Sequence, residues 1–111
     1  TVITAYADDP HVFFYIDPPY VEAGAQLYLN AFDGRDHIAL AEIITNIDAA
    51  HWLLTYDNAP LIERLYRAHP QFLLELTYSA RHPGRAQELL IASPQIAAAI
   101  TDLHQRRQAT A

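Results

Sequence analysis

The chain lacks cysteine, methionine and lysine altogether. Without cysteine it can form neither a disulfide bond nor a cysteine-based zinc site, and its composition is compatible with a reducing cytoplasm. The absence of methionine, together with the threonine at position 1, suggests a piece of a longer protein. None of the three glycines belongs to a glycine-rich phosphate loop. These absences exclude disulfide scaffolds and phosphate-loop enzymes.

Long apolar runs are also missing. No stretch approaches the roughly 18–20 apolar residues that a membrane-spanning helix needs. The chain has 111 residues, of which 51% are hydrophobic. The sequence therefore predicts one small domain with a core of its own rather than a disordered chain.

Basic side chains are few, and the formal net charge is −6. The arginines cluster loosely at Arg81 and Arg85, and again at Arg106 and Arg107. Contacts of Lys and Arg with phosphates dominate the affinity of proteins for nucleic acids. If this chain acts on DNA, most of the basic binding surface should therefore lie elsewhere.

An apolar run at residues 12–16 leads directly into the tetrapeptide Asp17-Pro18-Pro19-Tyr20. The run predicts a strand buried on both faces, as in a parallel sheet. Proline cannot donate to a sheet ladder, so the strand should end there, with Asp17 and Pro18 extended beyond its carboxyl end. Ligands of open α/β sheets bind at that edge.

The tetrapeptide suits methylation of an exocyclic amine. The Asp17 carboxylate and the Pro18 carbonyl could accept the two amine hydrogens and free the nitrogen lone pair for attack on a methyl group. Tyr20 offers a flat face for stacking on a base, which would have to be flipped out of a duplex. The alternative is a strand that simply ends in a Pro-Pro turn, because short motifs also occur by chance.

The rest of the chain predicts an α/β fold. A helix opens near Asp33 and Asp36, a second strand covers residues 52–56 and ends at Asp57-Asn58, and Pro60 lies in the first turn of another helix. Strand, helix, strand and helix in succession indicate a parallel unit. Residues 72–78 and 88–92 then predict an antiparallel hairpin. The expected inward faces of the three helices are Leu40, Ile43, Ile44 and Ile47; Leu61, Ile62, Leu65 and Tyr66; and Ile96, Ile100 and Leu103.

With these elements in order, the sequence resembles the Dam-like DNA adenine methylases, whose methyl donor is S-adenosylmethionine. The resemblance covers residues 12–93 of a single partial catalytic domain at 1–111, with residues 94–111 as a C-terminal helix and tail. Its order and spacing are more specific than any one motif. After the tetrapeptide, the matching positions are Tyr28, Phe32, Asp36 and His37; Leu54 to Asn58; Glu63 to Tyr66; Tyr78 and Ser79; and Glu88 to Ile91.

The resemblance implies roles for individual residues. Asp17 and Pro18 would hold the amine of the target adenine, and Tyr20 would stack on the flipped base. Asp17 would also lie beside the sulfonium of S-adenosylmethionine. Tyr78 is the candidate for a second aromatic wall of the base pocket, or else an ordinary hairpin residue. The partner would be DNA, and Pro19 completes the catalytic tetrapeptide.

Thr55 and Asp57 would line the same edge of the sheet by this resemblance. Capping of the following helix by Asp57 or Asn58 is the slightly favoured alternative. The six histidines occupy different elements at no metal-ligand spacing, so they are expected in solvated or turn positions rather than in a metal site.

The family's early strand with a glycine-bearing turn, which begins the cofactor site, has no counterpart in the sequence. The chain therefore resembles the second half of a Rossmann-like methyltransferase fold, with parallel strands and a C-terminal antiparallel hairpin. The strand at residues 12–16 would be a bare edge. We expect a homo-oligomer through that edge, or a complex with the missing N-terminal half.

Two other functions stay open. The chain could be a non-catalytic remnant that serves as an interaction domain, which the acidic charge would suit. It could also be an RNA or protein amine methyltransferase, since some of these carry a similar motif. The sequence does not distinguish restriction–modification from a phage or a housekeeping role.

Overall fold

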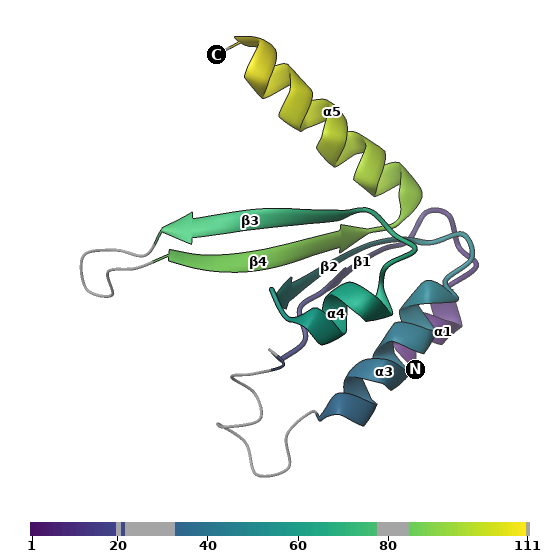
Figure 1. Cartoon of the computed structure of the whole chain (residues 1–111). Coiled ribbons are helices and arrows are strands. Elements are labelled where there is room, and N and C mark those ends of the chain that lie inside the picture. Colours follow the sequence, from purple (N-terminus) through teal and green to yellow (C-terminus); the bar gives the residue numbers. More distant parts are fainter. Residues whose placement is uncertain (20, 22–32, 78–84, 111) are drawn as a thin grey trace.

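The computed structural model describes residues 1–19, 21, 33–77 and 85–110 (Figure 1). The described helices and strands are, in order, α1 (Val2–Tyr6), β1 (Phe13–Ile16), α3 (Gly34–Thr45), β2 (His51–Asp57), α4 (Pro60–Leu65), β3 (Gln71–Thr77), β4 (Arg85–Ala92) and α5 (Pro94–Thr110). None of the described helices is both long enough and apolar enough to cross a membrane.

The four strands form one mixed sheet in the order β1-β2-β4-β3. β1 and β2 are parallel, and β4 runs antiparallel to both of its neighbours, β2 and β3. The predicted parallel unit and antiparallel hairpin are confirmed. The sequence did not indicate that β4 would lie between β2 and β3. The result is a small α/β fold that is compatible with part of a methyltransferase domain.

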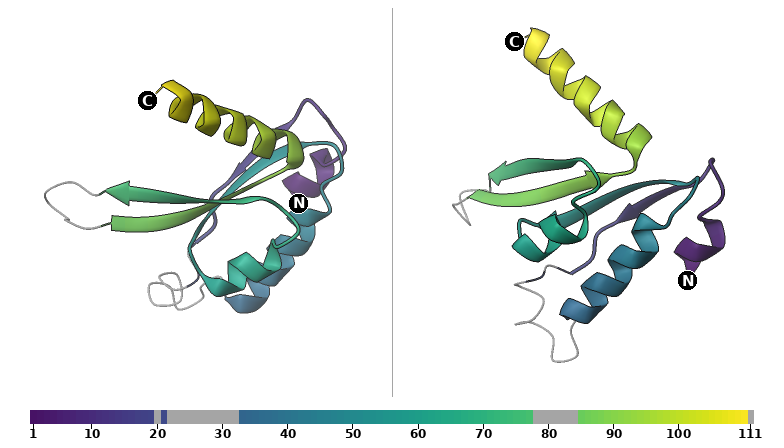
Figure 2. Two further views of the ribbon diagram at one scale, coloured as in Figure 1. Left: turned by 45° about the horizontal axis from the view of Figure 1, so that its top comes forward. Right: turned by 45° about the vertical axis from the view of Figure 1, so that its right-hand side comes forward.

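One face of the sheet carries the core. Helices α3 and α4 lie on this face, whereas α5 lies on the opposite side (Figures 1 and 2). β2 supplies alternate side chains to the core, as a strand with one buried face must. The largest buried groups of the cluster are Ile44, Trp52, Leu54, Tyr56, Ile62, Tyr66, Leu89 and Ile91.

The opposite face, here called the open face, is only partly covered. Helix α5 packs on β2 and β4 there. A cavity lined by Phe72, Leu90 and Ile100, among others, lies between this helix and β3–β4. Over β1 the open face lacks a described cover, and Phe13 and Tyr15 are 50% and 62% exposed.

Two expectations about the burial of apolar residues are wrong. The strand at residues 12–16 is not buried on both faces: exposure alternates along β1, because β1 is an edge strand whose open face has no described element over it. Leu103 was expected to face inward, but it is 62% exposed. Helix α5 rises away from the sheet beyond its first turns, so its later residues leave the packed region (Figure 1).

Local signals explain where the helices begin. The Asp33 carboxylate accepts from the amides of Arg35 and Asp36, and Asp36 accepts from the Asp33 amide, which completes a capping box at the start of α3. Pro60 is in the first turn of α4, where its missing N–H costs nothing. The Ser93 hydroxyl accepts from the Trp52 amide at 2.9 Å and so joins the end of β4 to β2.

We predict that Leu54→Ala destabilises the domain by about 2–5 kcal/mol, because it removes a fully buried side chain from β2, one of the two central strands. Leu73→Ala is the matched control, since Leu73 is 54% exposed and should cost much less. Urea unfolding followed by circular dichroism measures both. Leu54 and Leu73 lie on the same face of the sheet, so equal losses for the two variants would contradict a core centred on β2.

Candidate functional site

The carboxyl ends of β1 and β2 lie side by side. Their parallel register pairs Ile16 with Leu54, so the next residues, Asp17 and Thr55, are neighbours at the same edge. The Thr55 hydroxyl donates to Oδ1 of Asp17 at 2.7 Å. Thr55 is only 5% exposed, whereas Asp17 is exposed. The site thus presents a carboxylate to solvent and holds it from below by a buried hydroxyl.

A second hydrogen bond fixes the chain beyond the tetrapeptide. The Val21 amide donates to Oδ1 of Asp57 at 2.9 Å. Thr55 and Asp57 are two residues apart on β2, so both side chains lie on the open face. The segment that contains the tetrapeptide is therefore bonded to β2 before the prolines and again after them.

The prediction that Asp57 or Asn58 caps the following helix is wrong. The N-cap of α4 is Ala59, and no side chain makes a capping hydrogen bond there. The Asp57 carboxylate is directed instead to Val21, and the Asn58 amide donates to Oε1 of Gln87 on β4 at 3.1 Å. The alternative, that Thr55 and Asp57 line the edge beside the tetrapeptide, is the one that agrees with the structure.

The other predicted site residues are only partly described. Pro18 is half-buried and Pro19 is exposed next to Asp17. Tyr20 and Tyr78 lie outside the described residues, and so do Tyr28 and Phe32. The stacking roles of the two tyrosines therefore stay predictions.

A polar contact that the sequence analysis missed lies behind the site. His37, from α3, is 1% exposed, and its Nδ1 lies 2.7 Å from the hydroxyl oxygen of Tyr56 on β2. The expectation that this histidine is a solvated residue is wrong. A signal was present: His37 precedes Leu40, Ala41 and Ile44 at the helical spacing of a buried face.

Burial sets the charge states of His37 and Tyr56. Desolvation lowers the pKa of His37, although the carboxylates of Asp57, Asp36 and Asp33 act in the opposite direction. Desolvation also raises the pKa of Tyr56, with Asp57 adding to the effect. Both groups are therefore neutral near pH 7, and the hydrogen-bonded pair of His37 and Tyr56 behind the site carries no charge.

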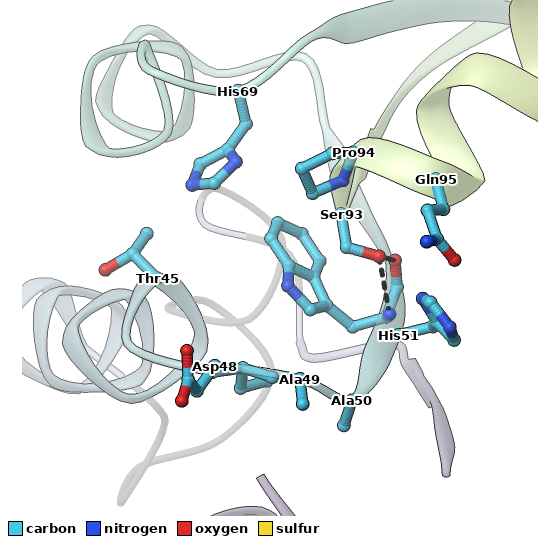
Figure 3. A pocket seen from close by; sticks show the side chains of 11 residues that line it. Thr45, Asp48, Ala49, Ala50, His51, His69, Ser93, Pro94 and Gln95 are labelled. Atoms are coloured by element: carbon cyan, nitrogen blue, oxygen red, sulfur yellow. Dashed lines mark hydrogen bonds between the residues drawn. The ribbon is translucent and has the colours of Figure 1, made fainter. Parts of the chain in front are cut away.

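Another hollow lies at the far end of β2. It is a cavity of about 330 Å³ whose walls include His51, His69, Ser93 and Gln95 (Figure 3). The aromatic ring of Trp52 meets His69 edge-on, with 5.1 Å between ring centroids. This cavity is at the amino end of the strand, whereas Asp17 lies beside its carboxyl half, so it is separate from the tetrapeptide. Within the described part of the chain, no group of three or more His, Asp or Glu side chains could hold a metal ion.

Comparison with known proteins gives one family. The family described as D12 class N6 adenine-specific DNA methyltransferase matches residues 1–79. The matched region contains the tetrapeptide, Thr55 and Asp57, and it ends before β4. No curated protein matches the chain significantly. The match confirms the family resemblance that the sequence motifs predicted.

The buried histidine predicts a pH-dependent stability. The folded pKa of His37 lies below its ordinary value of about 6.5, so the unfolded chain binds the proton more readily. The contribution of neutral, buried His37 to the free energy of unfolding is complete above the ordinary pKa of about 6.5 and is lost as the pH falls through the folded pKa. His69, whose pKa is also lowered by burial, acts in the same direction.

We therefore expect the free energy of unfolding to fall between pH 7 and pH 5, and His37→Gln to reduce that slope. At pH 7 this variant should cost about 1–3 kcal/mol, because the Tyr56 hydroxyl loses its buried partner. Urea unfolding at several pH values measures both effects. His11→Gln, which replaces an exposed imidazole, should follow the parent chain. An unchanged slope in His37→Gln would refute the assignment of the pH dependence to His37.

Proposed function

Because the chain belongs to the D12 class N6 adenine-specific DNA methyltransferase family, we propose that Asp17 and its neighbours carry methyl transfer to the exocyclic amine of adenine in DNA. The observation that supports this most is the Asp17 carboxylate, which is exposed at the carboxyl edge of the parallel strands and fixed by Thr55. Ligands of open α/β sheets bind at this edge.

In this proposal Asp17 and Pro18 act as hydrogen-bond acceptors. The amine of adenine is a poor nucleophile, because its lone pair is delocalised into the ring. Oδ2 of Asp17 and the carbonyl oxygen of Pro18 each accept one amine hydrogen, which directs the nitrogen lone pair away from the ring plane. Thr55 bonds Oδ1, and none of the described residues bonds Oδ2, so Oδ2 is the oxygen that we assign to the substrate.

The same carboxylate suits a cationic cofactor. S-adenosylmethionine, when bound, supplies an electrophilic methyl group on a sulfonium centre. A fixed carboxylate favours positive charge nearby without any metal ion. Among the described residues Asp17 is the group we assign to this contact, and the fit rests on its charge and exposure.

The target base would reach Asp17 only after it has flipped out of the duplex. Tyr20, and Tyr78 on the far side, are proposed to stack on the flipped adenine. The net charge of −6 leaves little basic surface for the DNA backbone. Arg106, for example, already pairs with Asp102 at 3.0 Å. We therefore propose that most phosphate contacts come from outside this chain.

A non-catalytic interaction domain is the second candidate. The acidic charge and the exposed apolar side chains of β1 favour it. Binding of S-adenosylmethionine separates the two functions, because an interaction domain needs no methyl donor. Methylation of RNA or of a protein amide instead of DNA would be recognised by the choice of acceptor in a transfer assay.

We expect Asp17→Ala to reduce methyl transfer to adenine-containing DNA by about 10²–10³-fold or more, since it removes an oriented electrostatic contact at the reacting centre. Transfer of labelled methyl groups from S-adenosylmethionine, with calorimetric titration of the cofactor, measures the effect. Asp48→Ala is the matched control, because Asp48 is an exposed aspartate beside the cavity at the other end of β2. Full activity in Asp17→Ala would exclude the proposed role.

The same proposal needs a partner for β1. Among the described strands β1 pairs only with β2, so its other edge is open, and Phe13 and Tyr15 are exposed beside it. An open apolar edge of this kind readily pairs with another strand. We propose that this edge receives a strand of the other half of the catalytic domain and that, in the chain alone, a second copy takes its place.

Sedimentation of the chain alone is therefore expected to give a mass above the 12.5 kDa of one copy. Replacing Phe13 and Tyr15 together by glutamate should return it to a single copy, because charge on an edge opposes strand pairing. Leu103→Glu is the control, since Leu103 is as exposed as Tyr15 but lies on α5. A parent chain that sediments as one copy would exclude self-association.

A further inference from the structure

We infer that Thr55 and Asp57 are positioning residues, which act together to hold Asp17 and the chain at Val21 in a fixed place against β2. This inference rests on the proposed function, in which Asp17 and Pro18 contact the amine. Neither Thr55 nor Asp57 is assigned a contact with substrate. Each acts through its bond to the segment that carries the tetrapeptide.

The sequence of the segment explains why side chains must hold it. Pro18 and Pro19 have no N–H, so the main chain cannot be tethered at those positions by its own donors. After the prolines, the Val21 amide donates a hydrogen bond to Asp57. Before the prolines, the bond is made instead by the Asp17 side chain to Thr55.

The bond from Thr55 also selects an orientation of the carboxylate. The hydroxyl donates to Oδ1 of Asp17 at 2.7 Å, which leaves Oδ2 as the oxygen that we assign to the amine. A carboxylate without this bond could rotate about its Cβ–Cγ bond and present either oxygen. Since Thr55 is almost completely buried, its own side chain has little freedom, and the orientation is transmitted from a rigid strand.

The strand end that carries both residues is itself fixed from the other face. Tyr56, between Thr55 and Asp57, is fully buried, and its hydroxyl lies 2.7 Å from Nδ1 of His37. On the neighbouring strand, Leu90 and Glu88 pair with Thr55 and Asp57. The end of β2 is thus supported by α3 and β4, which makes it a stable base for the segment.

The variants distinguish the loss of a hydrogen-bonding group from a change in the size of the side chain. Thr55→Val keeps the shape but loses the donor, and Thr55→Ser keeps the donor. Asp57→Ala loses the acceptor, and Asp57→Asn keeps an oxygen that can accept from Val21. Thr45→Val is the matched control, because its hydroxyl also donates a hydrogen bond, to the Ala41 carbonyl in α3.

Two readouts need no activity. By nuclear magnetic resonance, exchange of the Val21 amide hydrogen should be about tenfold faster in Asp57→Ala, the order of change that one lost hydrogen bond produces, and close to the parent rate in Asp57→Asn. The Asp17 carboxyl carbon should shift in Thr55→Val and stay near its parent position in Thr55→Ser. Neither signal should change in Thr45→Val. Unchanged signals in Thr55→Val and Asp57→Ala would overturn the inference.

The kinetic readout tests positioning rather than folding. In a preparation that transfers methyl groups, Thr55→Val should lower kcat by about 10²-fold with little change in KM, as expected for a misplaced reacting group, and Thr55→Ser should restore most of the rate. An unchanged kcat, or a loss explained wholly by a lower melting temperature, would overturn the inference.

The two proposals fail in different ways. If the chain transfers no methyl group to adenine even when it is combined with the other half of the catalytic domain, the result would count against the proposed function. The exchange and carboxyl signals would still decide whether β2 holds the segment. If transfer is present and the resonance signals respond but kcat does not, the bonds serve the fold alone, and the positioning role is wrong.

Discussion

The parallel pairing of β1 with β2 is the constraint on which the site depends. This pairing brings two carboxyl ends to one edge of the sheet and sets Asp17 beside Thr55, although the residues are far apart in the sequence. A shift of one residue in the register would turn Thr55 and Asp57 to the face packed by α3 and α4, because side chains alternate along a strand. The chemistry of the edge is therefore decided by the register.

The two faces of the sheet have different functions. The face under α3 and α4 is closed by large side chains and includes the neutral contact between His37 and Tyr56. The open face carries Thr55 and Asp57 at one end and the exposed side chains of β1 beside them. A closely packed face beneath an exposed edge is a suitable base for a site, because the packed side chains hold the polar groups of the edge in fixed positions.

Membership in an adenine methyltransferase family and the geometry of the edge support one another. The family suggests an amine as the acceptor, and the structure provides a carboxylate that is exposed, oriented and joined to a rigid strand. The scarcity of basic residues and the open edge of β1 are the two features from which we propose additional protein surface, for the DNA backbone and for the strand edge.

The sequence by itself determined the strand–helix–strand–helix order, the start of α3 near Asp33 and Asp36, the hairpin of β3 and β4 and the tetrapeptide, because turn chemistry and apolar periodicity are local signals. Only the tertiary structure decided that β4 lies between β2 and β3, that β1 is exposed on one face and that His37 is buried. It also decided that Asp57 holds Val21 rather than capping α4. These outcomes depend on which segments become neighbours in space, and a polar side chain with several possible partners bonds the one that the fold brings within reach.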